Sequence, residues 1–242
     1  MRARAFPLPA VERTSRAAAR WGARQVVRAC GPSMRVPWGI ARGVRLERDE
    51  TTTVTFPLGL YEIELAPSVR RLCRPGTRSF DIGSLNGYYA LVFSRLSGAP
   101  VVAFDFDAGA CARIARNLAA NPVEGARVTV ERLYLAYETN PAANATTLDA
   151  YVAARGLAPD LLKIDVEGAE AGLLSGARQV LAEHGPALIV ETHSPELEES
   201  CAALLAEAGY RPEVVETRRR PVQRRRTTHN RWLVAPGRDR RD

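Results

Sequence analysis

The sequence predicts an α/β domain with a mainly parallel seven-stranded sheet, helices on both faces and a C-terminal antiparallel hairpin. From Arg78 onwards, short apolar segments alternate with helical patterns of about ten residues or more. The chain has 242 residues, 46% of them hydrophobic, which is ample material for the core of such a domain. Helices that connect successive strands imply right-handed crossovers, and therefore a parallel sheet.

Seven strands are expected. Five short apolar runs form the parallel part of the sheet, and they cover 79–83, 101–106, 127–133, 160–166 and 186–192. Two further runs, 212–217 and 230–235, are expected to form the C-terminal hairpin around an arginine-rich loop.

Helical patterns occupy the segments between these strands, at 88–96, 108–121, 147–156, 169–185 and 194–209. The last helix has the clearest start, because Ser194 is a good N-cap and Pro195 is preferred at the first helical position. Gly185 is well placed to end the helix before it. Asp107 suits the N-cap of the helix that starts at 108, which leaves Asp105 available for another role.

The residues before the first core strand predict an additional segment. We expect 1–58 to form a basic helical segment and a hairpin at 43–56 that pack on the core, 59–236 to form the main domain, and 237–242 to be a disordered basic tail. No run of about 18 apolar residues predicts a membrane span, and the arginine-rich start lacks the apolar centre of a secretory signal. A cytoplasmic protein is therefore expected.

The net charge of +7 is unevenly distributed. Residues 1–43 and 217–242 each carry +8, which leaves −9 for 44–216. An acidic body with two basic ends differs from the even basic coat of a general nucleic-acid-binding protein. The loop 217–228 contains six arginines, at positions within 218–226, but no aromatic side chain for stacking on bases. Nucleic acid is therefore not the expected partner.

The cysteines predict neither a zinc site nor a disulfide framework. Cys30, Cys73, Cys111 and Cys201 are scattered and show no C-x-x-C spacing. A free thiol inside an apolar helical pattern behaves as a small hydrophobic side chain, and we expect structural roles for these residues.

Polar side chains gather where the predicted parallel strands end, which is where ligands bind in an open parallel sheet. The first strand leads into the sequence DIGSLNG, in which Asp81 is followed by Gly83 and Gly87. Glycine permits a left-handed backbone and lets a ligand approach the chain closely. The second strand ends at Asp105, where a carboxylate can bind both hydroxyls of a ribose.

The spacing of these glycines distinguishes between two nucleotide cofactors. A dinucleotide fingerprint, G-x-G-x-x-G, places a pyrophosphate at a helix N-terminus. This chain has D-x-G-x-x-x-G instead, with Asp81 before the first glycine. A carboxylate there repels a phosphate but suits a ligand that carries ammonium and sulfonium groups. The pattern therefore favours S-adenosylmethionine over NAD.

Four segments of the chain resemble the FkbM family of S-adenosylmethionine-dependent methyltransferases; in order, they are FDIGSLNGYYA, VVAFDFDAGACARIARNLAAN, TTLDAYV and DLLKIDVEGAEAGLLSGARQVL. With its flanking segments the resemblance covers 59–210. The resemblance implies a Rossmann-like class I methyltransferase fold. It implies that the protein methylates a hydroxyl oxygen of a small molecule or sugar. It also implies a cofactor site formed by Asp81, Gly83, Ser84, Asn86 and Gly87, with Asp105 where the family commonly has Glu-Pro.

The catalytic candidates follow the last two parallel strands. Lys163, the only lysine of the chain, precedes Asp165 and Glu167, and alternation along a strand predicts that all three lie on one face. Buried charges of this kind must pair, bind a ligand or emerge at the rim of the sheet. We assign Asp165 to orienting or deprotonating an acceptor hydroxyl, Lys163 to stabilising the oxyanion, and Glu191 to the same catalytic group. Lys163 could equally form only a buried ion pair with Asp165 or Glu191, and His193 is the alternative base.

A divalent cation such as Mg²⁺ would find ligands in Asp165, Glu167, Glu191 and His193. Their spacing matches no metal motif, so no metal is assigned. The expected partner is a small-molecule hydroxyl acceptor. The alternatives are an RNA methyltransferase that uses the basic termini and a non-catalytic binding module.

Overall fold

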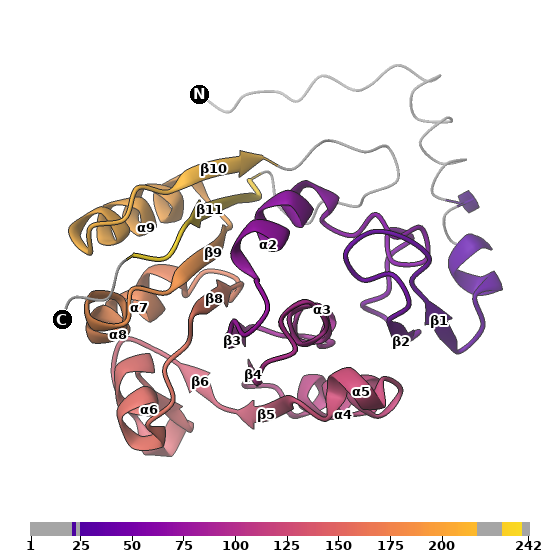
Figure 1. Cartoon of the computed structure of the whole chain (residues 1–242), viewed down its shortest axis with the longest axis horizontal. Helices are drawn as coiled ribbons and strands as arrows, with labels where there is room; N and C mark the ends of the chain where they lie inside the picture. Colours follow the sequence, from indigo (N-terminus) through magenta and orange to yellow (C-terminus); the bar gives the residue numbers. More distant parts are fainter. Residues whose placement is uncertain (1–20, 23–24, 217–228, 239–242) are drawn as a thin grey trace, which may run out of the picture.

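The computed structural model describes residues 21–22, 25–216 and 229–238. Its strands in the main sheet are β3 (Ser79–Ile82), β4 (Val101–Asp105), β5 (Val128–Arg132), β8 (Leu161–Ile164), β9 (Ala187–Thr192), β10 (Glu213–Glu216) and β11 (Arg231–Ala235). They are arranged in the order β10–β11–β9–β8–β3–β4–β5 (Figure 1). The neighbours from β9 to β5 pair in parallel, whereas β11 is antiparallel to both β9 and β10. The predicted sheet and its C-terminal hairpin are thus confirmed.

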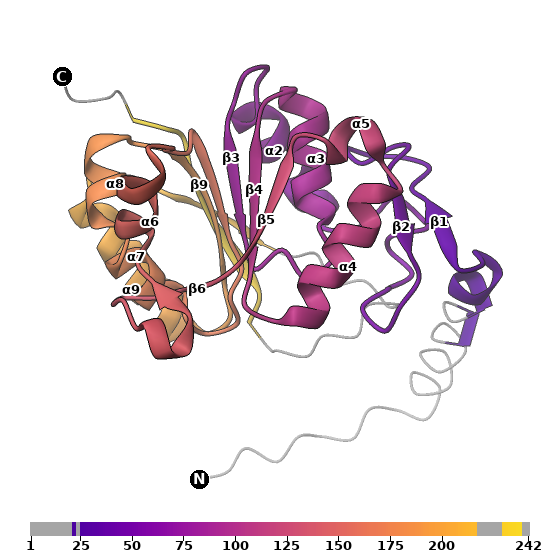
Figure 2. The same ribbon diagram turned by 90° about the horizontal axis from the view of Figure 1, so that it is seen from below.

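Helices cover both faces of this sheet (Figure 2). One face carries α2 (Ala66–Leu72), α3 (Tyr88–Ser97), α4 (Ala108–Ala119) and α5 (Pro122–Gly125). The other carries α6 (Leu148–Arg155), α7 (Glu170–Ser175), α8 (Arg178–Glu183) and α9 (Pro195–Glu207). Within the described residues, no helix combines the length and apolar character needed to cross a bilayer.

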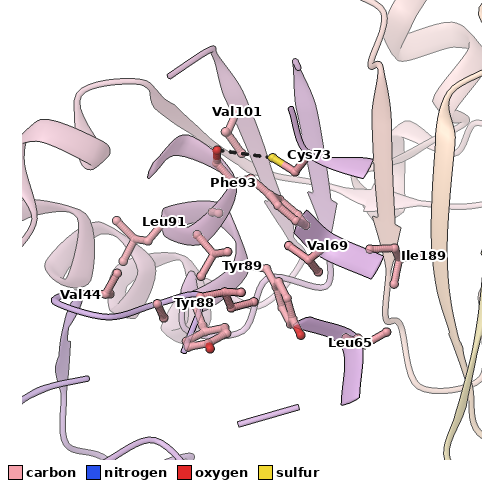
Figure 3. Close-up of a cluster of buried hydrophobic side chains, with 14 of the residues drawn as sticks. Val44, Leu65, Val69, Cys73, Tyr88, Tyr89, Leu91, Phe93, Val101 and Ile189 are labelled. Atoms are coloured by element: carbon pink, nitrogen blue, oxygen red, sulfur yellow. Dashed lines mark hydrogen bonds between the residues drawn. The ribbon is translucent and has the colours of Figure 1, made fainter. Parts of the chain in front are cut away.

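Two hydrophobic cores lie on opposite faces of the sheet because side chains alternate along each strand. In β4, Val101 and Ala103 contribute to the core under α3, whereas Val102 and Phe104 contribute to the core under α6 to α9. Figure 3 shows part of the first core, in which the thiol of Cys73 donates a hydrogen bond to the carbonyl of Phe93 over 3.7 Å. All four cysteines are free thiols, as predicted.

The predicted N-caps account for where several helices begin. The side chain of Asp107 accepts a hydrogen bond from the backbone N–H of Ala110 over 2.7 Å, and that of Ser194 from Leu197 over 3.2 Å. These bonds satisfy backbone donors that have no partner inside the helix. Asp107 is therefore the cap of α4, as the sequence indicated.

The single helix predicted over 169–185 is wrong, because the chain breaks into α7 and α8. Backbone N–H groups of Gln179 and Val180 at the start of α8 donate to the carboxylate of Asp149, over 3.0 and 2.8 Å. A Cβ at Gly176 would lie 2.2 Å from the carbonyl oxygen of Ala136, so only glycine fits at the break. The segment it touches includes the short parallel pair β6 (Tyr134–Leu135) and β7 (Ala145–Thr146), which periodicity did not predict.

The hairpin predicted over 43–56 is also wrong. The strand β2 (Arg45–Glu47) pairs instead with the earlier β1 (Ser33–Arg35), in antiparallel register. The residues after β2 turn and lead into a 3₁₀ helix, η1 (Ile63–Leu65), which precedes α2; a second, η2 (Pro141–Ala143), precedes β7. Met34 and Leu46 are buried, and this small sheet lies beyond α3 and α4 in Figure 2.

The basic ends lie largely outside the described residues. This applies to the predicted helical pattern before Trp21, to the arginines at 218–226 and to the tail after Arg238. Arg238 itself was expected in a disordered tail, but its backbone N–H donates to the carbonyl of Gly185 over 2.8 Å and its guanidinium lies over the ring of Tyr210.

Candidate active site

The register of the parallel strands places a set of charged side chains at one end of the first core. Asp81 of β3 is opposite Lys163 of β8, and Glu191 of β9 is opposite Trp232 of β11. Alternation sends all of these side chains to the face that α2 and α3 cover. Asp81, Lys163 and Glu191 are 1%, 2% and 4% exposed, so the charges are enclosed and must be compensated there.

Lys163 lies among four carboxylates, which we call the lysine cluster together with it: Asp81, Asp165, Glu191 and Glu62. Its Nζ is 3.1 Å from Oδ2 of Asp165 and 4.8 Å from the ring centroid of Tyr89. Burial alone would lower the pKa of Lys163, but the carboxylates, Asp165 foremost, raise it above its ordinary value. The lysine is therefore an ammonium at any physiological pH.

Asp165 and Glu191 carry different charges although they are neighbours. Burial and the proximity of Asp165 raise the pKa of Glu191 far above its ordinary value. Burial also disfavours ionisation of Asp165, but Lys163 outweighs it and lowers the pKa of Asp165. The opposite directions of these shifts favour the protonated form of Glu191 and the ionised form of Asp165. Trp232 Nε1 donates to Glu191 over 3.2 Å, and the amide of Asn230 donates to its other oxygen.

His193 is held by a carboxylate that the sequence analysis missed. Its Nδ1 is 2.5 Å from Oε1 of Glu170, which is completely buried, and its Nε2 is 3.7 Å from Oδ1 of Asp165. The hydrogen bond with Glu170 raises the pKa of His193 above its ordinary value. Glu170 also accepts the backbone N–H of Gly168, over 3.1 Å. Its position as the second glutamate of DVEGAE was the only available signal.

Glu62 is the second residue that the sequence analysis missed. It comes from the segment before the first core strand, and its Oε2 accepts the hydroxyl of Tyr89 over 2.8 Å. Burial raises the pKa of Glu62 and the nearby Lys163 opposes that shift. Its backbone is left-handed, with φ 40°, which costs about 1–3 kcal/mol for a residue other than glycine. Strained residues of this kind are concentrated at functional sites.

The cluster has an outer and an inner layer. Asp165 keeps 22% of its side chain exposed and His193 keeps 15%, whereas Lys163 keeps 3%. Glu62 is half-buried, and Glu191 is buried behind Asp165. Asp165 and Glu62 thus form the outer layer of the cluster, with His193 beside Asp165, and Lys163 and Glu191 form the inner layer.

Glu167 does not join the cluster, contrary to the face predicted from strand alternation. The strand β8 ends at Ile164, and Glu167 lies in the following turn, exposed and with a left-handed φ of 42°. The ligand atoms of Asp165, Glu191 and His193 do lie within 4.8 Å of one another. The ammonium of Lys163 contacts the same carboxylate, so the positive charge that these acids require is already present.

The predicted cofactor loop, residues 83–87, connects β3 to α3 by a tight left-handed path. Gly83, Leu85 and Gly87 have φ values of 82°, 51° and 76°. A Cβ at Gly83 would lie 1.8 Å from the carbonyl oxygen of Asp165, so this glycine is required by the contact between the loop and the end of β8. The close approach observed at Gly83 is to the protein's own backbone, and its contact with the cofactor stays a prediction.

The two remaining loop residues bind their own chain. The hydroxyl of Ser84 donates to the carbonyl of Asp81 over 2.7 Å. Oδ1 of Asn86 accepts the backbone N–H of Tyr88 over 3.1 Å, at the start of α3. Their predicted contact with the cofactor stays a prediction, and their observed role is to shape the loop.

Asp105 faces the cofactor loop from the end of β4. Its Oδ2 accepts the backbone N–H of Leu85 over 3.0 Å, and its Oδ1 accepts that of Asp107. The side chain beside it, Phe106, is 65% exposed and packs edge-on against Tyr134 with ring centroids 5.8 Å apart. Leu85 is exposed as well. This end of the sheet therefore presents a carboxylate flanked by uncovered apolar groups.

Asp81 supports a cationic ligand next to this loop. Both carboxylate oxygens are buried, and neither has a hydrogen-bond partner of standard geometry among the described groups. Burial raises the pKa of Asp81, while Lys163 opposes that shift. The side chain of Ser84 and the backbone N–H of Ala90 also lie close enough to lower the pKa of Asp81. A buried acceptor without a donor costs about 1–3 kcal/mol. The ammonium of a bound S-adenosylmethionine would supply the missing donors, so the residues present fit this cofactor.

The chain is similar to known methyltransferases in part of its sequence and in its fold. Residues 115–212 match the family model of the methyltransferase FkbM domain. No curated protein matches the chain in sequence.

Solved structures of methyltransferases share the fold. A methyltransferase FkbM from Methylobacillus flagellatus KT is 18% identical with a TM-score of 0.53, over 65% of this chain; the match spans only 43% of that longer chain. A SAM-dependent O-methyltransferase from Thermotoga maritima is 18% identical, with a TM-score of 0.52 over 74% of this chain and 66% of its own.

The C-terminal domain of precorrin-6Y C5,15-methyltransferase from Rhodobacter capsulatus is 16% identical, with a TM-score of 0.54 over 79% of this chain and 92% of its own. At these identities the structural likeness shows the fold, and the family model adds the relationship in sequence. Together they show that residues 115–212 match the methyltransferase FkbM domain and that the chain shares its fold with solved methyltransferase structures.

Proposed function

We propose that this protein transfers a methyl group from S-adenosylmethionine to a hydroxyl oxygen of a small molecule or sugar. The buried carboxylate of Asp81, whose two oxygens lack a hydrogen-bond partner of standard geometry among the described residues, carries the proposal. It lies directly before a glycine turn at the carboxyl end of a parallel sheet, where ligands bind in this class of fold.

Two carboxylates would hold the cofactor. Asp81 would accept hydrogen bonds from its ammonium group, and Asp105 would accept those of its ribose hydroxyls. The exposed rings of Phe106 and Tyr134 offer apolar surface beside the ribose position. The bound cofactor would supply a methyl group on a sulfonium, whose sulfur leaves with the bonding electron pair as a neutral thioether.

The acceptor would lie against the outer layer of the lysine cluster. Asp165 is ionised and partly exposed, so it can accept a hydrogen bond from the acceptor hydroxyl and take its proton as the new carbon–oxygen bond forms. Lys163 favours the ionised form of Asp165, and the buried side chain of Glu191 lies next to Asp165 on the side away from solvent. Glu62 lies close enough to Lys163 and Asp165 for their charges to shift its pKa, and it would bind a second polar group of the acceptor and so orient it.

An assay with labelled cofactor tests the reaction and its acceptor class. Transfer of the labelled methyl group is measured to methyl glycosides of common hexoses, to catechol and to total RNA, each with and without EDTA. We expect label in one or more of the hydroxyl compounds, none in RNA, and no effect of EDTA. Label in RNA alone would support the use of the basic termini instead. Cofactor binding without transfer to any compound would indicate a binding module.

A further inference from the structure

Three polar side chains from α4 and the turn after it hold the N-terminal part of the chain. Arg113 and Asn117 lie on α4, four residues apart and therefore on one face of the helix, and Asn121 is the N-cap of α5. All three are at most 9% exposed. Their partners lie in 45–51, which we call the cap segment.

Asn121 and Asn117 bind the backbone of β2. The amide of Asn121 accepts the N–H of Arg45 over 2.8 Å and donates to its carbonyl over 2.7 Å. Oδ1 of Asn117 accepts the N–H of Glu47 over 2.7 Å. These two side chains thus satisfy backbone groups of β2 that a neighbouring strand would otherwise bind.

Asn117 differs from Asn121 in its second bond. Its Nδ2 donates to the backbone carbonyl of Asn86, in the cofactor loop, over 2.8 Å. Asn117 is 1% exposed and Asn86 is 7% exposed, so water cannot easily replace this donor. One buried side chain therefore connects the cap segment with the loop that faces the predicted cofactor.

The cofactor loop depends on such outside bonds. Three of its five residues have a left-handed backbone, so it cannot form the regular hydrogen bonds of a helix or strand. Leu85 is held by Asp105, and Asn86 by Asn117. Loss of the second bond would leave a buried carbonyl without a donor, and the loop would shift to expose it.

A second connection runs beside the first. Arg113 Nε is 2.8 Å from Oδ2 of Asp49, whose Oδ1 accepts the hydroxyl of Thr51 over 2.7 Å. Oγ1 of Thr51 in turn lies 3.5 Å from Nδ2 of Asn86. The cap segment thus reaches the cofactor loop both through Asn117 and through Thr51.

We propose that Asn117 is a positioning residue for S-adenosylmethionine binding, which couples the docking of the cap segment to the shape of the cofactor loop. The inference rests on the proposed function, because it requires the loop at 83–87 to contact the cofactor. It assigns a role in cofactor affinity to a side chain that does not touch the cofactor.

Three variants separate the two bonds of Asn117. Asn117→Ala removes both, whereas Asn117→Asp keeps an acceptor for Glu47 but replaces the donor to Asn86 by an oxygen. Asn121→Ala is the matched control, because it loses two bonds to the cap segment and none to the loop. The affinities for S-adenosylmethionine and S-adenosylhomocysteine are measured by calorimetry, alongside melting temperatures and amide hydrogen exchange.

Both Asn117 variants are expected to bind S-adenosylmethionine about 3- to 10-fold more weakly, because this change in affinity corresponds to the free energy of one hydrogen bond. Asn121→Ala should bind within about twofold of the wild type even though its melting temperature falls like that of Asn117→Ala. Amides of the cofactor loop should exchange faster in both Asn117 variants. The amide of Glu47 should stay protected in Asn117→Asp only.

The contrary outcomes are distinct. Wild-type affinity in both Asn117 variants would overturn this role and leave the proposed function intact. Equal weakening in Asn121→Ala would assign the effect to general loosening of the cap segment and would overturn it as well. A wild type that binds neither ligand would refute the cofactor assignment itself, and the role of Asn117 with it.

Discussion

The two halves of the sheet's carboxyl edge are built by different means. Around β3 and β4, the cofactor loop is shaped mainly by backbone geometry: left-handed residues, a glycine forced against Asp165, and side chains that bind nearby peptide groups. Around β8 and β9, the lysine cluster is shaped by charges: one ammonium, ionised and protonated carboxylates, and an imidazole. The first half is thus held by backbone geometry and hydrogen bonds, and the second by the mutual compensation of buried charges.

This difference between the two halves predicts whether a substitution changes mainly ligand affinity or both stability and turnover. In the first half, removing a side chain should change ligand affinity more than folding, because most of its structure is backbone. In the second half, removing one charge leaves others buried and uncompensated, so both stability and chemistry should suffer. The predictions below test this contrast, beginning with the largest effect.

Lys163→Met should cause the largest loss of stability. It leaves Asp81, Asp165 and Glu62 without their only cation in the cluster, and breaking a buried pair costs about 3–5 kcal/mol. Urea denaturation measures the free energy of unfolding. Arg178→Met is the control, since its ion pair with Glu207 is exposed and is worth less than about 1 kcal/mol. Similar small losses in both variants would show that the cluster does not depend on its lysine.

Asp165→Asn should lower turnover by a factor of about 10² or more, because an amide cannot take the proton of the acceptor hydroxyl. The variant should bind S-adenosylmethionine nearly as the wild type does, since Asp81 and Asp105 are unchanged. Turnover on an acceptor found with the wild type is compared with cofactor affinity from calorimetry. Full turnover would remove Asp165 from the mechanism.

Glu62→Gly should separate strain from function. Glycine relieves the left-handed backbone, worth about 1–2 kcal/mol, but loses the hydrogen bond to Tyr89, worth about 1 kcal/mol, so stability should change by less than about 1 kcal/mol. Turnover should nevertheless fall about tenfold through loss of acceptor orientation. Glu62→Ala, which keeps the strain, should be less stable than the glycine variant. A glycine variant with undiminished turnover would make Glu62 a structural residue.

His193 should give the smallest effect, a dependence of stability on pH. Its pKa is raised in the folded protein by the hydrogen bond with Glu170. The stabilisation is therefore complete below the ordinary histidine pKa of about 6.5 and is lost as pH rises through the raised value. Urea denaturation of the wild type and of His193→Gln at several pH values isolates this contribution. An identical pH dependence in both proteins would contradict it.

Sequence reasoning succeeded where the signal was local. The seven strands and the D-x-G-x-x-x-G turn are written in consecutive residues, so periodicity and glycine spacing were sufficient to predict them. The β1–β2 pairing was missed because the polar turn after Arg48 resembled the centre of a hairpin, whereas the partner of β2 lay upstream. The break between α7 and α8 depends on Asp149, thirty residues before Gln179, and leaves no local trace.

The lysine cluster was predicted only in part for the same reason. Lys163 and Asp165 are neighbours in the sequence, and their pairing was one of two readings that the residues allowed. Glu62 and Glu170 come from other elements, and no sequence pattern predicts the contact of Glu62 with Tyr89 or that of Glu170 with His193. Glu167 was misplaced as well, because β8 ends at Ile164, whereas the predicted strand continued to residue 166.

Calorimetric titration with S-adenosylmethionine tests the central claim most directly, because it requires no knowledge of the acceptor. The wild type should bind, and Asp81→Asn should bind about 10- to 100-fold more weakly, since a hydrogen bond to a charged group is worth about 1.5–3 kcal/mol. Asp107→Asn, which alters only the cap of α4, should bind within about twofold of the wild type. A wild type that does not bind, or an Asp81→Asn variant that binds equally well, would contradict the assignment of this site to the cofactor.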